Sequence, residues 1–365
     1  MDYRSSRAAA LLRGLSLVCS VGVLFVIFSS AAAEPFQCNS SGTCDALVDY
    51  VLPNSTTLSR IQTLFNVKNL TSILGANNLP LSTPPQRTFP ANQTVKIPFP
   101  CICTKGATGK SNKLPIYTVV PNDGLYHIAA EVFSGLATFQ QIQAANNISN
   151  ANLIYVGQKL WIPLPCSCDQ VDGQMVVHYG YAVPARSSVD GIAQQYNTTA
   201  DVLLRLNGLA SPNDLKAGAI LDVPLKACAS MVSNTSLDYP LLVPNGTYTL
   251  TATNCVKCNC DAANNWTLNC EPSQIKSSVW SSCPSMQCQG TDNLYLGNTT
   301  SSSCSRSTCA YAGYYNNRTI STTTALDSTC PASDNNSSAM SMQGSWKRNL
   351  WLFVLVQVLV LCVWI

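Results

Sequence analysis

The chain has 365 residues, of which 46% are hydrophobic and 11% are charged, and its formal net charge is +3. That length is enough for several small domains. The two ends that we predict to be removed hold five of its 21 basic residues and one of its 18 acidic residues, which leaves 16 and 17 in the mature chain. A chain so close to neutral gives no electrostatic support for a nucleic-acid partner or an anionic surface.

The N-terminus has the three parts of a secretory signal peptide. Three arginines within the first 13 residues precede an apolar run from Leu15 to Phe28, and Ala31-Ala32-Ala33 is a small-residue cleavage site. We predict that residues 1–33 are removed and that the mature chain begins at Glu34. A membrane anchor is the weaker interpretation because no stop-transfer pattern follows.

Residues 34–100 predict a degenerate first module with the order β-α-α-β. Apolar and β-branched runs predict strands over 46–51 and 94–97. Between these strands, apolar residues at helical spacing predict helices over 58–65 and 70–74.

The stretch 116–163 shows the same order most clearly, and we predict that it forms the central module. Ile116–Val120 predicts a strand, and Asp123 is placed to cap the helix that follows. Thr138 and Gln141 have capping-box spacing and open a second helix. A closing strand over 159–162 completes a unit too small to be very stable without staples.

Residues 178–226 predict a third module, in which Ser187 or Ser188 caps the first helix. The three modules correspond at two points, which indicates an internal repeat. The second helices end at Asn77-Asn78, Asn146-Asn147 and Asn207-Gly208, and the closing strands end at Ile97-Pro98, Ile162-Pro163 and Val223-Pro224.

Cysteine pairs mark the joints between modules, at Cys101-Ile102-Cys103 and Cys166-Ser167-Cys168. Two cysteines one residue apart on an extended chain point to opposite sides, so each pair is expected to tie its joint to two different places. Six cysteines allow 15 connectivities, and spacing does not choose among them. A zinc site is the less favoured interpretation in a secreted chain.

Residues 229–332 differ in character and predict a Cys-rich region that is β-rich or irregular. It holds nine cysteines, and we expect Cys228 to pair with one of them. The Cys255-x-x-Cys258 spacing also occurs in redox and zinc motifs, but export favours structural disulfides. The 16 cysteines outside the predicted removed ends are even in number, as a fully paired framework requires.

The C-terminus has the pattern of a signal for a glycosylphosphatidylinositol (GPI) anchor. Residues 333–337 form a linker to the anchor, and we predict attachment at Ser337, with Asn336 or Ser338 as near alternatives, and removal of 338–365. The apolar run 350–365 is shorter than the roughly 20 residues that a spanning helix needs. A conventional single-pass helix is the alternative.

Thirteen Asn-x-Ser/Thr sequons also indicate an exported, glycosylated chain. The acceptors that we predict are Asn39, Asn54, Asn69, Asn92, Asn147, Asn197, Asn234, Asn245, Asn265, Asn298 and Asn317.

The sequence offers little catalytic material. Its two histidines, His127 and His178, are interpreted as surface or packing residues, because neither neighbours a nucleophile motif. No carboxylate pair of the kind that glycosidases use is recognisable. We therefore predict no catalytic residue, no metal and no cofactor.

The central stretch resembles a LysM module through Tyr117-Thr118-Val119, Asn122-Asp123-Gly124-Leu125, Asn146-Asn147, Asn152-Leu153-Ile154 and Gly157-Gln158-Lys159-Leu160. Over its whole length, the chain resembles plant LysM GPI-anchored receptors of the kind that binds chitin elicitors. The resemblance implies an α+β fold of three small β-α-α-β LysM modules stapled by disulfides, followed by the Cys-rich region. It also implies the disulfides Cys38–Cys103, Cys44–Cys168 and Cys101–Cys166.

The resemblance further implies a groove for N-acetylglucosamine oligomers between two loops of the central module. Its expected residues are Asn122, Asp123, Gly124, Leu125, Tyr126, Asn150, Ala151, Asn152, Leu153, Ile154 and Tyr155. The other modules are weaker candidates. A glycan on Asn54 would crowd the equivalent loop of the first module, and Pro184–Ser188 departs from the family pattern in the third.

The function implied is a receptor for chitin oligosaccharides at the outer face of the plasma membrane, held by a GPI lipid. We expect it to signal through a transmembrane LysM receptor kinase and to form a ligand-bridged homodimer. A peptidoglycan receptor of the same architecture is the main alternative. A wall-anchored carbohydrase and a purely structural wall protein are less favoured.

Overall fold

The computed structural model describes residues 35–228, 230–291, 293–316 and 319–328. Within these residues, no helix is both long and apolar enough to cross a membrane. The predicted signal peptide, the GPI site at Ser337 and the acceptor Asn317 lie outside the described residues.

The first module has the predicted order, with longer strands than its sequence indicates. Strands β1 (Gly42–Val51) and β4 (Thr94–Cys103) pair antiparallel over their whole length. Helices α1 (Leu58–Leu64) and α2 (Leu70–Ala76) lie between them in the chain. A small ladder joins β2 (Thr56–Thr57) to β3 (Thr88–Phe89).

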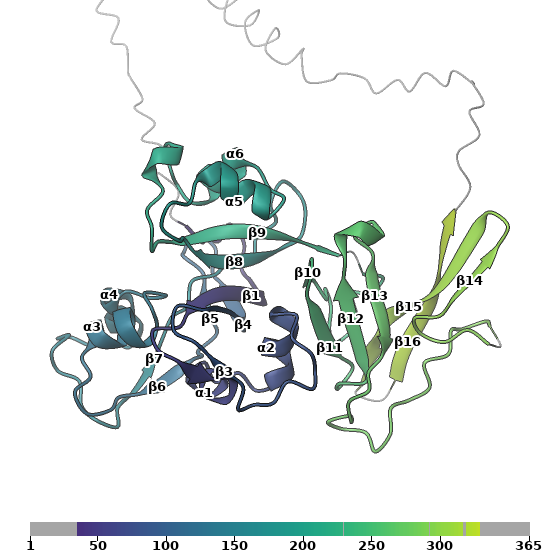
Figure 1. Ribbon diagram of the computed structural model, residues 1–365, viewed down its shortest axis with the longest axis horizontal. Helices are drawn as coiled ribbons and strands as arrows, with labels where there is room; N and C mark the ends of the chain where they lie inside the picture. Colours follow the sequence, from purple (N-terminus) through teal and green to yellow (C-terminus); the bar gives the residue numbers. More distant parts are fainter. Residues whose placement is uncertain (1–34, 229, 292, 317–318, 329–365) are drawn as a thin grey trace, which may run out of the picture.

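The third module shares a sheet with the first, which the sequence did not predict. Strand β8 (Val176–Ala182) pairs antiparallel with β9 (Ile220–Cys228) and parallel with β1. Two short strands, β5 (Lys110–Ser111) and β10 (Val243–Pro244), lie at the edges. The result is a six-stranded sheet with the order β10-β9-β8-β1-β4-β5, visible at the centre of Figure 1. The helices of the third module are α5 (Val189–Gln195), α6 (Ala200–Leu206) and η2 (Pro212–Asp214). Ser188 caps α5, which resolves the predicted choice between the two serines.

The central module keeps a two-stranded sheet of its own, beside the larger one (Figure 1). Its elements are β6 (Ile116–Thr118), α3 (Leu125–His127), the π-helical turn η1 (Ile128–Val132), α4 (Phe139–Ala145) and β7 (Lys159–Trp161). The predicted capping box is confirmed, because Thr138 and Gln141 satisfy each other's backbone N–H groups. The predicted cap at Asp123 is wrong: Gly124 occupies the cap position of α3.

The first and central modules share one apolar core. A chain of edge-to-face ring contacts runs from Tyr50 to Phe65, then to Phe133 and Tyr117, with centroids 4.9 to 5.8 Å apart. Offset and edge-to-face pairs of this kind add about 1 kcal/mol each to the burial of the rings. The two modules therefore form one packed unit.

The asparagine at the end of each second helix joins that helix to its closing strand. The Asn146 side chain donates to the Trp161 carbonyl and accepts from the Trp161 N–H, both at 2.8 Å. Asn77 makes the same two bonds with Lys96, and Asn207 makes them with Asp222. The side-chain amide of this repeated asparagine thus forms the same pair of hydrogen bonds with the closing strand that a neighbouring strand would form.

The three disulfides that the resemblance implied are present: Cys38–Cys103, Cys44–Cys168 and Cys101–Cys166. Each Cys-x-Cys joint is tied to two different places, as the alternation of an extended chain predicts. These bonds close loops of 65 to 124 residues, so they restrict the unfolded chain strongly.

The Cys-rich region forms two three-stranded antiparallel sheets. The first contains β11 (Tyr248–Thr251), β12 (Val256–Cys260) and β13 (Leu268–Pro272), with η3 (Ala262–Asn264) between the last two; the second contains β14 (Thr299–Ser302), β15 (Ser305–Tyr315) and β16 (Thr319–Ser328). The disulfides that join two described cysteines here are Cys228–Cys260, Cys255–Cys283, Cys258–Cys270 and Cys288–Cys309. Cys228 pairs into the region as expected, and Cys255 and Cys258 bond other cysteines rather than each other.

Candidate functional site

Two loops of the central module lie side by side because a backbone ladder joins their bases. The first loop begins after Val119 and the second ends at Gly157. Val119 donates to the carbonyl of Gln158 at 2.9 Å and accepts from the N–H of Gly157 at 2.8 Å. The ladder extends the β6–β7 pairing and fixes the distance between the loops.

Exposed apolar side chains concentrate on these two loops. Val120 is 48% exposed, Tyr126 68%, Leu153 70%, Tyr155 70% and Val156 61%. We call these five residues the central apolar patch. Apolar groups left in water next to rigid polar backbone are typical of a binding surface.

The first loop is held rigid from within by Asp123. Its carboxylate accepts from the hydroxyl of Tyr117 at 2.9 Å and from the N–H of Val120 at 2.8 Å, and only 2% of this side chain is exposed. Burial, and then the neighbouring carboxylate, raises the pKa of Tyr117, so that hydroxyl stays a donor to Asp123. Asp123 therefore shapes the loop rather than facing a ligand.

The second loop is braced by two side-chain bonds. The amide oxygen of Asn150 accepts from the N–H of Asn152 at 3.0 Å, and that of Gln158 accepts from the N–H of Tyr155 at 3.1 Å. The turn is closed by a bond from the N–H of Leu153 to the carbonyl of Asn150 at 2.9 Å. Both loops are thus preorganised, which lowers the entropy cost of binding.

The eleven predicted site residues divide by burial. Asn122, Tyr126, Asn150, Asn152, Leu153 and Tyr155 are exposed, and Gly124, Ala151 and Ile154 are half-buried. Leu125 is only 2% exposed and belongs to the core, and the carboxylate of Asp123 is buried within the first loop. Ile154 also packs against the core, so only part of it is available to a ligand.

Two patch residues, Val120 and Val156, were missed by the sequence reasoning. A signal for Val120 was present, because side chains alternate along a strand and Val119 is buried at 2% exposure. Val156 follows the predicted loop by one residue. Its exposure depends on the turn at Gly157, which has a φ of +86°.

The equivalent loop of the first module faces the central module rather than solvent alone. Pro53–Thr56 lines a cavity of about 1030 Å³ together with Tyr117, Val120 and His127. Asn54, a predicted glycan acceptor, lies in this cavity wall and is exposed. A ligand that reached this loop would have to share the space with that glycan.

The equivalent loop of the third module carries no exposed large apolar side chain among the residues that the structure describes. Its exposed residues include Pro184, Ala185 and Arg186, and Arg186 has a φ of +69°. Of the three modules, the central one alone presents an apolar patch on its loops within the described parts.

Neither histidine is arranged for catalysis. His127 contacts Glu131 at 3.2 Å and Asp123 at 3.6 Å on the surface of α3. His178 is 1% exposed and contacts Asp222 at 2.8 Å, so substrate has no access to it. The one group of metal-ligand side chains found in the described residues is Cys44, Cys101 and Cys168, whose sulfurs are already joined in disulfides.

The glycan acceptors lie outside the two central loops in the sequence. All ten predicted acceptors that the structure describes are exposed. None of them lies within 120–126 or 150–157, and the nearest in sequence is Asn147. In space, a glycan on Asn54 would share a cavity wall with Val120 at the edge of the first loop.

Comparison with known proteins identifies proteins that are similar to this chain. The LysM domain profile matches residues 117–163 and 183–224. LysM domain-containing GPI-anchored protein 2 of Arabidopsis thaliana is 45% identical over 95% of this chain and 97% of that protein. Chitin elicitor-binding protein of Oryza sativa subsp. japonica is 43% identical over 88% of each. A crystal structure of the ectodomain of a receptor-like kinase aligns with 26% identity and a TM-score of 0.41, over 49% of this chain and 90% of that one.

Proposed function

Because this chain belongs to the family of LysM domain-containing GPI-anchored proteins, we propose that it is a cell-surface pattern-recognition receptor for chitin oligosaccharides in plant innate immunity. One close relative carries the name chitin elicitor-binding protein. The proposal is a binding function, since the two relatives described above, each matched over 88% or more of this chain, are named for binding or anchoring.

The observation that carries this function is the central apolar patch on two preorganised loops. An N-acetylglucosamine oligomer is neutral and repeats an acetamido group along its length. Its binding needs apolar surface for the sugar face and the acetamido methyl, and backbone N–H and C=O groups for the amide. The patch supplies the apolar surface, with 70% of Leu153 and of Tyr155 exposed, and the loops around it supply the backbone groups.

Charge favours chitin over peptidoglycan as the ligand. Peptidoglycan adds carboxylates to the same sugar backbone, and a matching site would place Lys or Arg near them. The two loops, 120–126 and 150–157, contain neither residue. A neutral oligomer leaves no unpaired charge at this surface.

Calorimetry on the secreted ectodomain tests the proposal. Chitohexaose should bind saturably, and a muropeptide of similar length should bind at least tenfold more weakly. Equal binding of both would favour the peptidoglycan alternative. If neither chitohexaose nor the muropeptide bound, the result would favour a purely structural wall protein.

A carbohydrase would hydrolyse the oligomer, which can be tested separately. Incubation of the ectodomain with chitohexaose should leave the oligomer intact, because no accessible carboxylate pair with a catalytic arrangement is found on the central loops. Shorter products in the mass spectrum would overturn the assignment as a binding protein.

We further propose attachment to the outer face of the plasma membrane through a GPI lipid, and signalling through a transmembrane LysM receptor kinase. The GPI-anchored relatives and the C-terminal sequence pattern support the attachment. Phospholipase C specific for phosphatidylinositol should release the protein from membranes. Retention of a protein with an intact C-terminus would instead indicate a membrane segment.

A further inference from the structure

A cavity of about 520 Å³ lies away from the central apolar patch, where the Cys-rich region meets the first module. We call it the junction cavity. The first module contributes Pro98–Pro100 of β4 and 65–69 between α1 and α2, and the Cys-rich region contributes 242–244 and 247–249. Its volume is in the range of pockets that hold a small organic ligand.

Apolar groups form the deep part of this cavity and polar groups form its rim. Phe99, Val243 and Tyr248 are 6%, 1% and 7% exposed. Lys68 and Asn112 are exposed and also line the cavity, so they lie near its mouth. The lining also includes the hydroxyl residues Ser72 and Thr249 and the carboxylate of Asp45. Apolar rings and proline edges with such polar groups around them offer the surface that a hexopyranose face and its acetamido group require.

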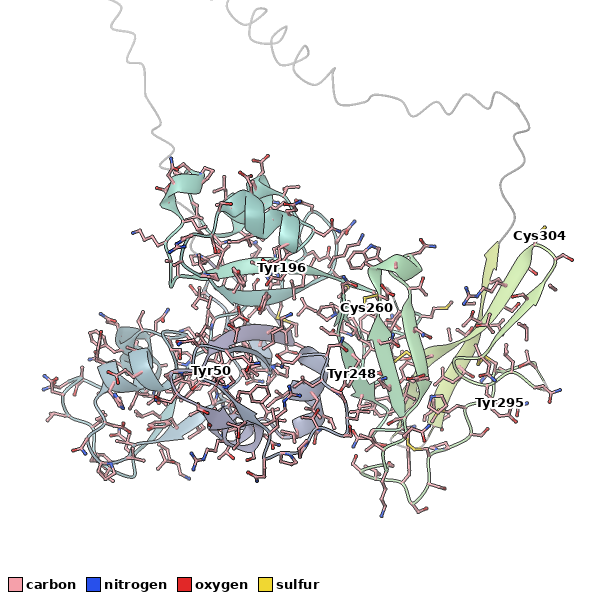
Figure 2. All side chains as sticks on the ribbon, viewed as in Figure 1. Tyr50, Tyr196, Tyr248, Cys260, Tyr295 and Cys304 are labelled. Atoms are coloured by element: carbon pink, nitrogen blue, oxygen red, sulfur yellow. A yellow bond between two sulfur atoms is a disulfide. The ribbon has the colours of Figure 1, made fainter. Side chains whose placement is uncertain are left out.

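The two parts of the molecule touch closely beside this cavity. Tyr248 of β11 lies against helix α2, where Figure 2 labels it, and its hydroxyl donates to the carbonyl of Leu79 at 2.5 Å. A Cβ added at Gly75 would lie 2.1 Å from the carbonyl oxygen of Tyr248. The junction is therefore narrow at Tyr248 and open at the cavity next to it.

Asn69 lies in the cavity wall and begins the sequon Asn69-Leu70-Thr71. It is exposed, and it holds the cap position of α2 without a side-chain capping bond. An asparagine at a cap normally accepts from a backbone N–H of the first turn. An N-glycan is joined to the other end of the amide, at its nitrogen, and the exposed side chain of Asn69 leaves that nitrogen accessible.

We propose that the N-acetylglucosamine core of an N-glycan on Asn69 occupies the junction cavity and holds the first module against the Cys-rich region. The tether sets the ligand at a high effective concentration, so even a weak contact would be populated. A ligand that binds only the docked state stabilises that state. The glycan then acts as part of the fold rather than as surface cover.

Enzymatic release of glycans from the folded protein tests where this core lies. Peptide N-glycosidase must reach the sugar next to the asparagine. We expect release at Asn69 to be at least tenfold slower than at Asn197, an exposed acceptor that does not line the cavity, and equal at both after reduction and denaturation. Equal release from the folded protein, or an Asn69 that glycopeptide mass spectrometry finds unoccupied, would overturn the proposal.

Hydrogen exchange on sequon variants tests what the glycan does. Thr71→Ala removes the sequon, Thr71→Ser keeps it, and Asn197→Gln removes the control glycan. We expect Thr71→Ala to raise exchange severalfold in peptides covering both 65–76 and 241–251, while the other two variants match the wild type. Unchanged exchange in Thr71→Ala would show that the glycan does not hold the junction.

Discussion

At the scale of single residues, the asparagines that end the second helices could be predicted as a repeat, but their hydrogen bonds could not. Their recurrence at positions 77, 146 and 207 is visible in the sequence. Their role depends on a strand that follows 15 to 19 residues later, which local patterns do not place in space. The repeat could be predicted, but the hydrogen-bonded side chain could not.

Asn146→Ala should destabilise the protein by about 1–3 kcal/mol, because it removes bonds at both ends of the amide and leaves Trp161 backbone groups unpaired. Denaturant unfolding with disulfides intact measures the change. Gln140→Ala, at an exposed position of the same helix, is the control and should be nearly neutral. A loss no larger than that of the control would contradict the role we assign to Asn146.

Leu153→Arg should weaken chitohexaose binding at least tenfold without lowering the unfolding midpoint, because a charge would enter the patch at a side chain that is 70% exposed. Met175→Arg, 43% exposed outside the central loops, should bind as the wild type does. Ile154→Arg is a poorer test, since Ile154 also packs against the core. If the Leu153→Arg protein bound chitohexaose normally, the central apolar patch would not be the binding surface.

At the scale of elements, local sequence patterns predicted the helices and strands whose formation depends on residues close together in the chain. Helical spacing and the capping box predicted α1, α2 and α4, and the strand order of each module followed. The parallel pairing of β1 with β8 joins residues more than 130 positions apart, such as Leu47 and Tyr179. No local signal specifies that partner, so the shared sheet was not predicted.

Two buried ionisable groups at this shared sheet give stability a pH dependence. Burial raises the pKa of Asp49 to about 6, although the Tyr179 hydroxyl, the Ala182 N–H and Lys96 act against that rise. Burial alone would lower the pKa of His178, but the Asp222 carboxylate and the Asp169 carbonyl outweigh it and raise that pKa above 6.5. In both cases the folded state holds its proton to higher pH than the unfolded chain does.

Stability should therefore fall as pH rises. The Asp49 contribution is complete below the unfolded pKa of 3.8 and is lost as pH rises to about 6, which corresponds to roughly 3 kcal/mol. The His178 contribution is complete below pH 6.5 and is lost as pH rises through its higher folded pKa. Denaturant unfolding from pH 4 to 9 measures this. Asp49→Asn should flatten the lower window and His178→Gln the upper one, and a stability that rises across both windows would contradict the assignment.

At the scale of the whole molecule, the central module keeps its own two-stranded sheet and carries the central apolar patch on its loops. The disulfides Cys44–Cys168 and Cys101–Cys166, which reach the joint just after it, and a common core fix it to the first module. In the function that we propose, each ectodomain offers one oligosaccharide surface, the central apolar patch. A repeating polymer long enough to reach two such surfaces would join two membrane-anchored copies, with the second contact made at high effective concentration.

Long oligomers should consequently assemble the receptor and short ones should not. Chitooctaose should crosslink at least two copies on membranes together with a transmembrane LysM receptor kinase, whereas chitotriose should occupy single sites and compete with it. Crosslinking on membranes followed by mass spectrometry measures this. Equal assembly with both oligomers, or assembly that never contains a kinase, would argue against ligand bridging.

The most direct measurement of the site is hydrogen exchange of the ectodomain with and without chitohexaose. Protection is predicted in peptides covering 120–126 and 150–157, with no change in 53–56 of the first module or 184–188 of the third. Protection in those other loops, with the central loops unchanged, would contradict the assignment of the ligand to the central module.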